Sequence, residues 1–177
     1  MNYENMSREK LIELLKLKDI KIQELTDIAS LDYLTKVFNR RTGIEKFNEI
    51  YKYSLINDKD ISICFTDVDN LKLINDTWGH KCGDEALVTI SYTIKNSIRK
   101  EDFIFRFGGD EFVIIFPDTS MEQADKILKR ICKKLREISV TSKYDLGVSY
   151  GLCSYKEFGR DNMSFNDFLN NADSAMY

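Results

Sequence analysis

The sequence is poor in proline, histidine and long apolar runs, and each shortage excludes a class of protein. One proline and 12% aromatic residues in 177 exclude a chain that is mainly disordered. The longest unbroken apolar run, 112–116, is far shorter than the roughly 20 residues of a membrane-spanning helix, so we expect no membrane segment. One histidine and four cysteines without a C-x-x-C pair argue against a zinc site.

Charge and motif content exclude further classes. The formal net charge is -3, and such a chain is a poor nonspecific nucleic-acid binder because phosphate binding depends on clustered Lys and Arg. Neither G-x-x-x-x-G-K-[ST] nor G-x-G-x-x-G is present, so a P-loop NTPase and a Rossmann enzyme lose their main support. The N-terminal region shows no apolar signal core and the cysteines are scattered, which predicts reduced thiols and a cytoplasmic protein.

Residues 7–30 are predicted to form one charged helix, which Ser7 can cap. A heptad seam interrupted by Lys18 runs along it, at Leu11, Leu15, Ile22, Leu25 and Ala29. Because the other faces are polar, this is either a short coiled-coil stalk or a helix packed on the domain. We therefore divide the chain into an N-terminal signalling or stalk helix, 1–30, and one domain, 31–177.

Hydrophobic periodicity predicts alternating helices and strands in the rest of the chain. The expected helices include one led into by 32–41, with an apolar face at Ile44, Phe47, Ile50 and Tyr51, and others at 71–76, around 87–98, from Ser120 and from Ser164. The expected strands are 61–66, the two arms of a glycine hairpin, 104–107 and 112–116, and 145–155. Since βα connections are mixed with an antiparallel hairpin, we expect an α+β fold, with a sheet covered by helices.

Polar residues gather at three points of this pattern. Asp67 and Asp69 follow a buried strand, and Asp110 and Glu111 follow the paired glycines of the hairpin. A third group is expected on a loop between two helices, at Asn75, Asp76, His80, Gly83 and Asp84. Mg²⁺ takes oxygen ligands, typically one or two carboxylates plus substrate phosphates. If the two strands are neighbours, Asp67 with Asp110 or Glu111 supplies such a pair.

Several ordered motifs resemble those of the GGDEF family of diguanylate cyclases. Residues 106–112, RFGGDEF, resemble the family's central motif, and 67–87 resemble its D-x-D-x-F-K-x-x-N-D…G-H-x-x-G-D block. The stretches DYLT (32–35), NRR (39–41), VSYGL (148–152) and NADSAMY (171–177) resemble its outer motifs. The resemblance covers about residues 32–177 and implies a nucleotidyl-cyclase-like fold with a βααββαβ core and a mostly antiparallel central sheet.

The resemblance also implies a reaction, in which two GTP become cyclic di-GMP and two pyrophosphates. Two subunits would face each other, and the 3′-hydroxyl of one GTP would attack the α-phosphate of the other with the help of Mg²⁺ or Mn²⁺. The site residues that it implies are Asp67, the Val68 carbonyl and Glu111 for the metal, Asp110 as further ligand or base, Asn75 and Asp84 for guanine, His80 beside them, Lys72 for phosphate, and Gly108 and Gly109 for close approach of the ligand.

Arg99 and Asp102 resemble the family's R-x-x-D site, at which the product cyclic di-GMP inhibits the enzyme. Arg130, on the following helix, is a weaker candidate for a partner contact. An alternative stays open, in which the chain is a weak or inactive member that binds cyclic di-GMP or GTP and acts by dimerisation.

The chain departs from the family pattern at two places. Lys36 stands where the family has glycine, which we interpret as a surface change. The sequence ends at Tyr177, before the family's A-K-x-x-G-R-N stretch, so the domain is expected to lack a C-terminal tail whose Lys and Arg contact the triphosphate.

Overall fold

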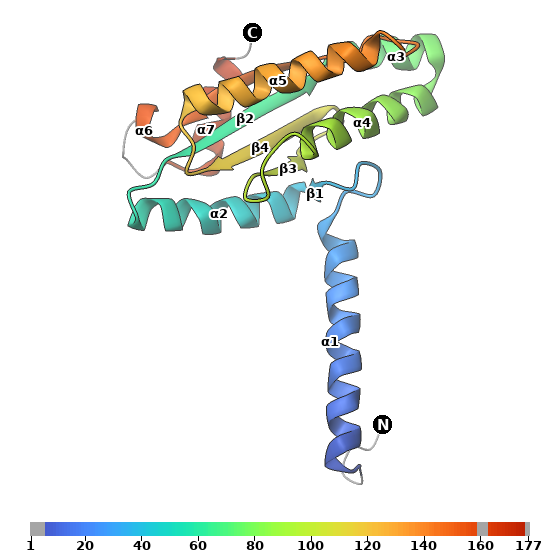
Figure 1. Cartoon of the computed structure of the whole chain (residues 1–177), viewed down its shortest axis with the longest axis vertical. Helices are drawn as coiled ribbons and strands as arrows, with labels where there is room; N and C mark the ends of the chain where they lie inside the picture. Colours follow the sequence, from blue (N-terminus) through green and yellow to red (C-terminus); the bar gives the residue numbers. More distant parts are fainter. Residues whose placement is uncertain (1–5, 159–162, 176–177) are drawn as a thin grey trace.

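The computed structural model describes residues 6–158 and 163–175, and in it a long helix projects from an α+β domain (Figure 1). Helix α1 (Arg8–Ser30) begins where predicted, because the Lys10 amide donates to Ser7 Oγ at 3.3 Å. Its last turn is tied to the domain by Asn39 Nδ2, which donates to the Ala29 carbonyl at 2.6 Å. No helix in the described part of the chain has the length and apolarity needed to cross a membrane.

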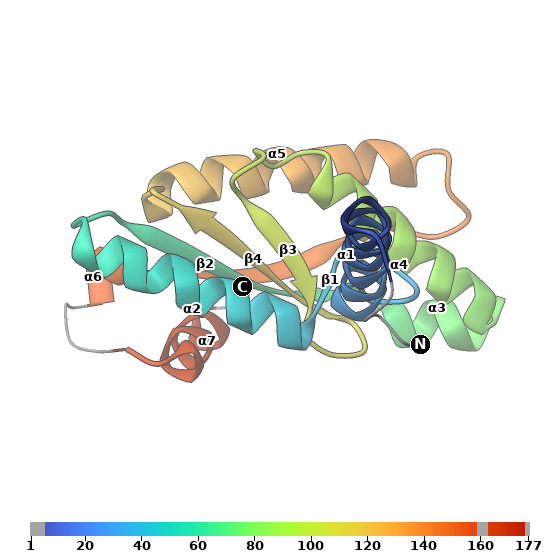
Figure 2. The ribbon, with the colours of Figure 1, turned by 90° about the horizontal axis from the view of Figure 1, so that it is seen from below.

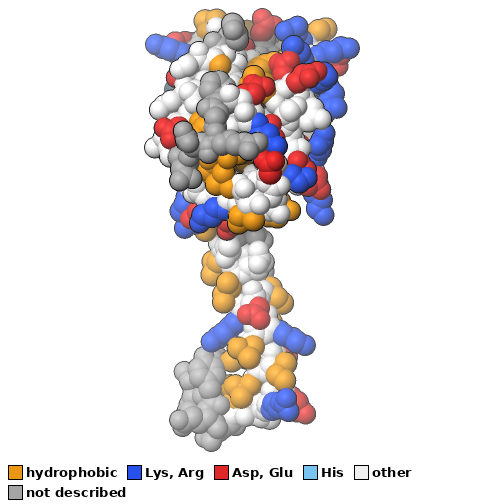
Figure 3. Space-filling view, turned by 90° about the vertical axis from the view of Figure 1, so that its left-hand side faces the viewer, with side chains coloured by type: hydrophobic (Ala, Val, Ile, Leu, Met, Phe, Trp, Pro, Cys, Tyr) orange, Lys and Arg blue, Asp and Glu red, His pale blue; other side chains and the backbone are white. Residues whose placement is uncertain are grey.

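The apolar seam of α1 is not covered by the domain. The Leu15, Ile22 and Leu25 side chains are more than half exposed, and Figure 3 shows apolar side chains along the projecting stem. Because the helix extends away from the domain instead of lying on it, its geometry favours a coiled-coil stalk over a helix packed on the domain. Its role as a stalk stays a prediction.

The central sheet has five strands in the order β1-β3-β4-β2-β5. These are β1 (Phe38–Asn39), β2 (Ile61–Val68), β3 (Phe103–Arg106), β4 (Glu111–Pro117) and β5 (Val148–Ser154). Every neighbouring pair is antiparallel except β1 with β3. The predicted mostly antiparallel sheet and the predicted hairpin are confirmed.

Helices cover both faces of the sheet (Figure 2). Helices α2 (Arg40–Ile56) and α7 (Phe165–Ser174) lie on one face, and α4 (His80–Lys95) and α5 (Met121–Ser139) lie on the other. With α3 (Leu71–Trp78) before α4, the chain from β2 to β5 has the predicted βααββαβ order. The short helix α6 (Tyr155–Phe158) and strand β1 were not predicted, since neither is long enough to show a period.

Alternate residues of the central strands feed two apolar cores. Ile63 and Phe65 of β2 pack beneath α2 and α7, whereas Cys64 and Val68 pack beneath α4 and α5. Because both faces of the sheet are buried, strand β4 is a continuous apolar run with no polar alternation. The predicted capping box at Ser120 and Gln123 is present, and Ser164 caps α7 in the same way.

One structural expectation is wrong. The polar residues between Asn75 and Asp84 do not lie on a loop, because Asn75 and Asp76 belong to α3 while His80, Gly83 and Asp84 belong to α4. A single residue, Gly79, separates the two helices with φ 85°, a conformation that L side chains rarely adopt. The sharp turn therefore needs one glycine and not the longer break that the sequence suggested.

Candidate active site

Two carboxylates lie near each other where β2 ends and β4 begins, at one end of these two central strands. Asp67 and Glu111 are directly opposed in the antiparallel register, so their side chains lie on the same face. Asp110 is fixed beside them, because the Val68 amide donates to the Asp110 carbonyl at 3.1 Å. The two strands are therefore neighbours, as a carboxylate pair between Asp67 and the hairpin requires.

Asp67 lies in an unfavourable place for a negative charge. Partial burial raises its pKa to about 6, with further contributions from the nearby carboxylates of Asp110, Glu111 and Asp69. No hydrogen bond from a described residue reaches the Asp67 carboxylate to offset this repulsion. A bound cation would relieve this repulsion. The end of the two strands at Asp67, Asp110 and Glu111, called the acidic edge below, is therefore a candidate cation site.

Gly108 of the hairpin turn leaves the space that the Glu111 carboxylate occupies. A Cβ built on Gly108 would overlap Oε2 of Glu111, so the carboxylate of Glu111 rests directly against this glycine. A Cβ on Gly109 would meet nothing within 4 Å. Gly108 is therefore required for packing, whereas Gly109 leaves open space beside the turn.

Arg106 clamps the turn from the strand that precedes it. Its Nε donates to the carbonyl of Gly108 at 3.1 Å and its Nη2 to that of Gly109 at 2.6 Å. Its Nη1 forms an ion pair with Asp32 Oδ1 at 3.1 Å, and both side chains are 15% exposed. The glycine turn is therefore connected to the chain segment that follows α1.

Asp32 in turn organises residues 32–36. Its Oδ1 accepts from the amide and the hydroxyl of Thr35, at 2.9 and 2.7 Å. Burial raises the pKa of Asp32, but the bonds from Thr35 and Arg106 outweigh it and the pKa is lowered. Sequence reasoning quoted both motifs and missed this pair. The available signal was a lone arginine at the end of an otherwise apolar strand.

Helices α3 and α4 bring the proposed guanine contacts close together. A Cβ on Gly83 would overlap Oδ1 of Asn75, so the two helices approach closely at this point. Asp84 follows Gly83 directly and is exposed, as is His80 at the first position of α4. Lys72, in the first turn of α3, is also exposed. These side chains are accessible to a ligand without rearrangement of the core.

Asp69 has a structural role, as its position after the strand suggested. It accepts from Ser149 Oγ at 2.7 Å, and its amide donates to the Gly147 carbonyl at 3.0 Å. A Cβ on Gly147 would approach the Asp69 carboxylate to 2.5 Å. Asp69 therefore ties the start of β5 to the end of β2.

Arg99 and Asp102 lie at the opposite end of β3 from the glycine turn. The Asp102 carboxylate is buried and accepts from the Arg99 amide at 2.8 Å, and burial raises its pKa despite this bond. The Arg99 side chain is exposed. Arg130 is held within the domain, because its Nη2 donates to the Ser97 carbonyl at 2.6 Å. Both arginines are exposed, and Arg130 differs from Arg99 in that part of its guanidinium is bound to the domain.

The acidic edge fits a magnesium ion that shares its ligands with a substrate. Within the described residues no three His, Cys, Asp or Glu side chains are grouped closely enough to hold a metal by themselves. Mg²⁺ does not require such a group, because it usually takes one or two carboxylates and completes its shell with water and phosphate. Asp67 and Glu111, mutually repelling and opposed across two strands, supply that number.

The fold and this acidic edge define a domain of the nucleotidyl-cyclase-like class. The sequence model described as "Diguanylate cyclase, GGDEF domain" matches residues 29–177. The chain therefore belongs to the GGDEF family.

Named relatives agree with this assignment. The probable diguanylate cyclase DgcC of Escherichia coli K12 is 32% identical over 158 residues, which are 88% of this chain and 42% of that protein. The bifunctional diguanylate cyclase/cyclic di-GMP phosphodiesterase MucR of Pseudomonas aeruginosa is 29% identical over 157 residues, 88% of this chain and 22% of its own length. The chain thus spans less than half the length of these two relatives.

Solved structures share the fold. The GGDEF domain of DgcB from Caulobacter crescentus, in complex with c-di-GMP, matches with a TM-score of 0.74 and 25% identity, covering 83% of this chain and 85% of that one. The coiled coil and GGDEF domain of the same protein match with a TM-score of 0.82, covering 94% and 88%. At 22% identity this second match supports the fold alone.

Proposed function

We propose that this chain is a diguanylate cyclase domain, which condenses two GTP into cyclic di-GMP and two pyrophosphates. The observation that carries the proposal is the opposition of Asp67 and Glu111 at the same end of their strands, where partial burial, together with the carboxylates of three acidic neighbours, raises the pKa of Asp67 to about 6. Membership of the GGDEF family and relatives named as diguanylate cyclases support the same activity.

The acidic edge is the proposed position of the triphosphate and its cation. Asp67, Glu111 and the Val68 carbonyl would hold Mg²⁺ or Mn²⁺, with Asp110 as a further ligand or as the base for the 3′-hydroxyl proton. When bound, the ion neutralises phosphate charge, which is the main requirement of phosphoryl transfer. The exposed Lys72 adds a second positive charge for the phosphates.

The α3–α4 contact is the proposed guanine site. Guanine presents N1–H and N2–H₂ as donors, which suit the carboxylate of Asp84 and the amide oxygen of Asn75. Adenine lacks this pair of donors and would leave the carboxylate unpaired, so the site favours GTP over ATP. His80 lies beside them as a substrate contact, and Gly108 and Gly109 let the nucleotide approach the turn.

The reaction needs two copies, since each subunit would bind one GTP. The 3′-oxygen of one GTP would form a bond to the α-phosphorus of the other as the bond to the pyrophosphate breaks, and Asp110, in its role as base, would take the hydroxyl proton. Helix α1, with its uncovered apolar seam, would hold two domains within reach. We therefore propose a homodimer in action, with residues 1–30 as its stalk.

We further propose that Arg99, with Asp102, belongs to a site for the product. Arginine suits phosphate and the Hoogsteen edge of guanine, and here Asp102 shapes the loop by binding the Arg99 amide. Arg99→Ala should weaken cyclic di-GMP binding about tenfold or more in titration calorimetry, with GTP binding unchanged. Equal product affinity in parent and variant would reject this part of the proposal.

The direct test of the activity is incubation with GTP and Mg²⁺ followed by chromatography for cyclic di-GMP and pyrophosphate. Formation of both, in a ratio of one to two, is the expected result. Binding of GTP or cyclic di-GMP without turnover, under conditions in which a known diguanylate cyclase is active, would instead favour the binding module.

A further inference from the structure

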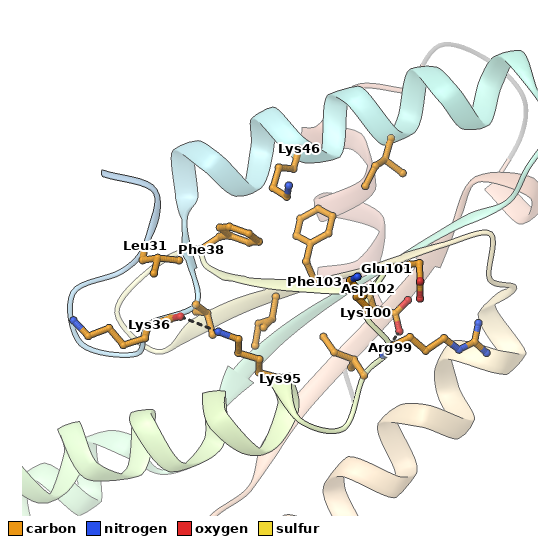
Figure 4. Close-up of a pocket in the computed structure, with 14 residues that line it drawn as sticks. Leu31, Lys36, Phe38, Lys46, Lys95, Arg99, Lys100, Glu101, Asp102 and Phe103 are labelled. Atoms are coloured by element: carbon orange, nitrogen blue, oxygen red, sulfur yellow. Dashed lines mark hydrogen bonds between the residues drawn. The ribbon is translucent and has the colours of Figure 1, made fainter. Parts of the chain in front are cut away.

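A pocket lies beneath the base of α1, between the 32–36 turn, the first half of α2, the end of α4 and the start of β3 (Figure 4). It encloses about 430 Å³, which is within the range of small-molecule sites. Part of its lining is apolar and includes Val37, Phe38, Ile50, Phe103 and Ile104. The Phe38 and Phe103 rings meet edge to face at 6.1 Å and form an aromatic corner.

Three lysines from three different elements surround this corner. They are Lys36 on the turn, Lys46 on α2 and Lys95 at the end of α4. Lys46 Nζ lies over the Phe38 ring at 5.1 Å, and Lys95 Nζ donates to the Lys36 carbonyl at 3.3 Å. No carboxylate in the described part of the chain forms an ion pair with any of the three. Their charges are therefore available to a ligand.

The two acidic residues of the pocket lie at its other end. Figure 4 shows Glu101 and Asp102 beyond Phe103, away from Lys36 and Lys46. The Asp102 carboxylate is occupied by the Arg99 amide, and the Arg99 guanidinium points away from the lysines. The lysine end is thus separate from the region proposed above for the product.

We propose that this pocket is a second ligand site, which takes a small aromatic phosphate, an anion with a flat apolar body. The ring would lie against Phe38, Phe103 and Ile50, where apolar surface is removed from water. The phosphate would lie between Lys46 and Lys95, whose compact ammonium groups suit it as point charges. Neither feature suffices alone, because the apolar side chains offer no charge to a phosphate and the lysines lack the forked geometry that holds a free anion.

The pocket lies next to the segment that supports the glycine turn. Leu31 and Lys36 line it and flank Asp32, the residue that holds Arg106 and through it the glycine turn. A ligand here would contact both the base of α1 and the segment that supports the glycine turn beside the acidic edge. The site is therefore placed to report occupancy to the turn, although its existence does not depend on the cyclase activity.

The proposal is tested with 1-naphthyl phosphate as the probe, by titration calorimetry on the full chain. The probe should bind at least tenfold more tightly than either 1-naphthol or inorganic phosphate. Lys46→Glu should weaken it at least tenfold, and Lys46→Gln by a smaller factor. Lys52→Glu, an exposed lysine further along the same helix, should change nothing. Equal binding by parent and Lys46→Glu, or equal weakening by Lys52→Glu, would overturn the site.

Hydrogen exchange locates the probe independently of activity. Bound probe should slow exchange in peptides that cover 31–38 and 98–104 and leave 67–84 unchanged. Protection confined to 67–84 would place the probe in the nucleotide site and overturn the proposal, whatever the outcome of the GTP assay.

Discussion

An aspartate lies near each end of strand β2, and the two carboxylates differ in the hydrogen bonds and charges around them. Asp60, just before the strand, accepts hydrogen bonds from the Ile61 and Lys156 amides at 2.9 and 3.2 Å and from Ser154 Oγ at 3.4 Å. Asp67, near the other end, receives no such bond from a described residue and faces three acids. The first end is arranged for stability, and the second keeps an unfavourable charge that a bound cation or protonation would relieve.

The same contrast extends to the residues around each end. Near Asp60 the Lys59 ammonium pairs with Asp118 at 2.7 Å, and the Asp118 amide donates to the Asp60 carbonyl at 2.8 Å. Left-handed backbone occurs near both ends, at Asn70 with φ 56° and at Asp58 and Asp118 with φ 50° and 48°, so it does not distinguish them. Next to Asp67, however, the buried Thr66 hydroxyl has no hydrogen-bond partner among the described residues. An unsatisfied buried polar group is uncommon in folded proteins, so Thr66 adds to the contrast between the two ends.

The largest expected effect comes from exchanging the two aspartates for neutral residues. Asp67→Asn should lower GTP turnover about 100- to 1000-fold, the range seen when a charge-stabilising group is removed from a catalytic site. Asp60→Ala is the matched control and should keep turnover within about twofold, because it acts only on stability. The measurement is the initial rate of cyclic di-GMP formation. Similar losses in both variants would mean that the ends do not differ in the way described.

The next effect concerns the clamp on the glycine turn. Arg106→Ala removes three donors to the turn and to Asp32, and should cost about 2 kcal/mol of stability and about tenfold in turnover. Asp32→Asn should show part of both losses. In a double-mutant cycle by urea unfolding the pair should be coupled by about 1 kcal/mol.

This coupling should depend on pH in a defined direction. The pKa of Asp32 is lowered in the folded chain, so its contribution is present above the unfolded pKa and is lost as the pH falls through the folded value. Additive losses at neutral pH would show that Arg106 and Asp32 do not support each other.

A smaller effect concerns the free energy of unfolding, which should rise for a substitution at one end of β2 and fall for a substitution at the other. The pKa of Asp67 is about 6 in the folded chain and about 4 when unfolded, so its charge destabilises the fold above pH 6 and this penalty disappears as the pH falls to 4. Without metal, Asp67→Asn should therefore gain about 1 kcal/mol at pH 7.5, after allowance for solvent screening, and nothing at pH 4. Asp60→Ala should lose about 1–2 kcal/mol at pH 7.5. Urea unfolding at both pH values decides whether the signs differ.

The smallest expected effect is at Lys36, outside both ends. Its φ of 56° lies in the region that favours glycine, so Lys36→Gly should stabilise the fold by about 0.5–1 kcal/mol in urea unfolding. Lys133→Gly, at an exposed position inside α5, should instead lose about 1 kcal/mol. A loss at Lys36 would contradict the backbone argument.

The sequence predicts the sheet and its helices well, because periodicity, the glycine hairpin and the Ser120 capping box are local signals. It also places Asp67 and Glu111 at strand ends, although only the register shows that they are opposed. The Asp32–Arg106 pair is 74 residues apart in the chain, and no local signal joins its members. Lys36 shows a different limit, because the family's glycine at this position was interpreted as a surface change, and only the turn, with φ 56°, shows why glycine is favoured there.

The central claim is that the end of β2 at Asp67 holds a cation together with GTP, and calorimetry of Mg²⁺ binding tests it most directly. The titration uses 3′-deoxy-GTP, which lacks the attacking hydroxyl and so stops turnover. Mg²⁺ should bind to the complex of the parent chain and of Asp60→Ala with equal affinity, and at least tenfold more weakly to that of Asp67→Asn, about 1.4 kcal/mol. Equal Mg²⁺ affinity in all three chains would contradict the claim.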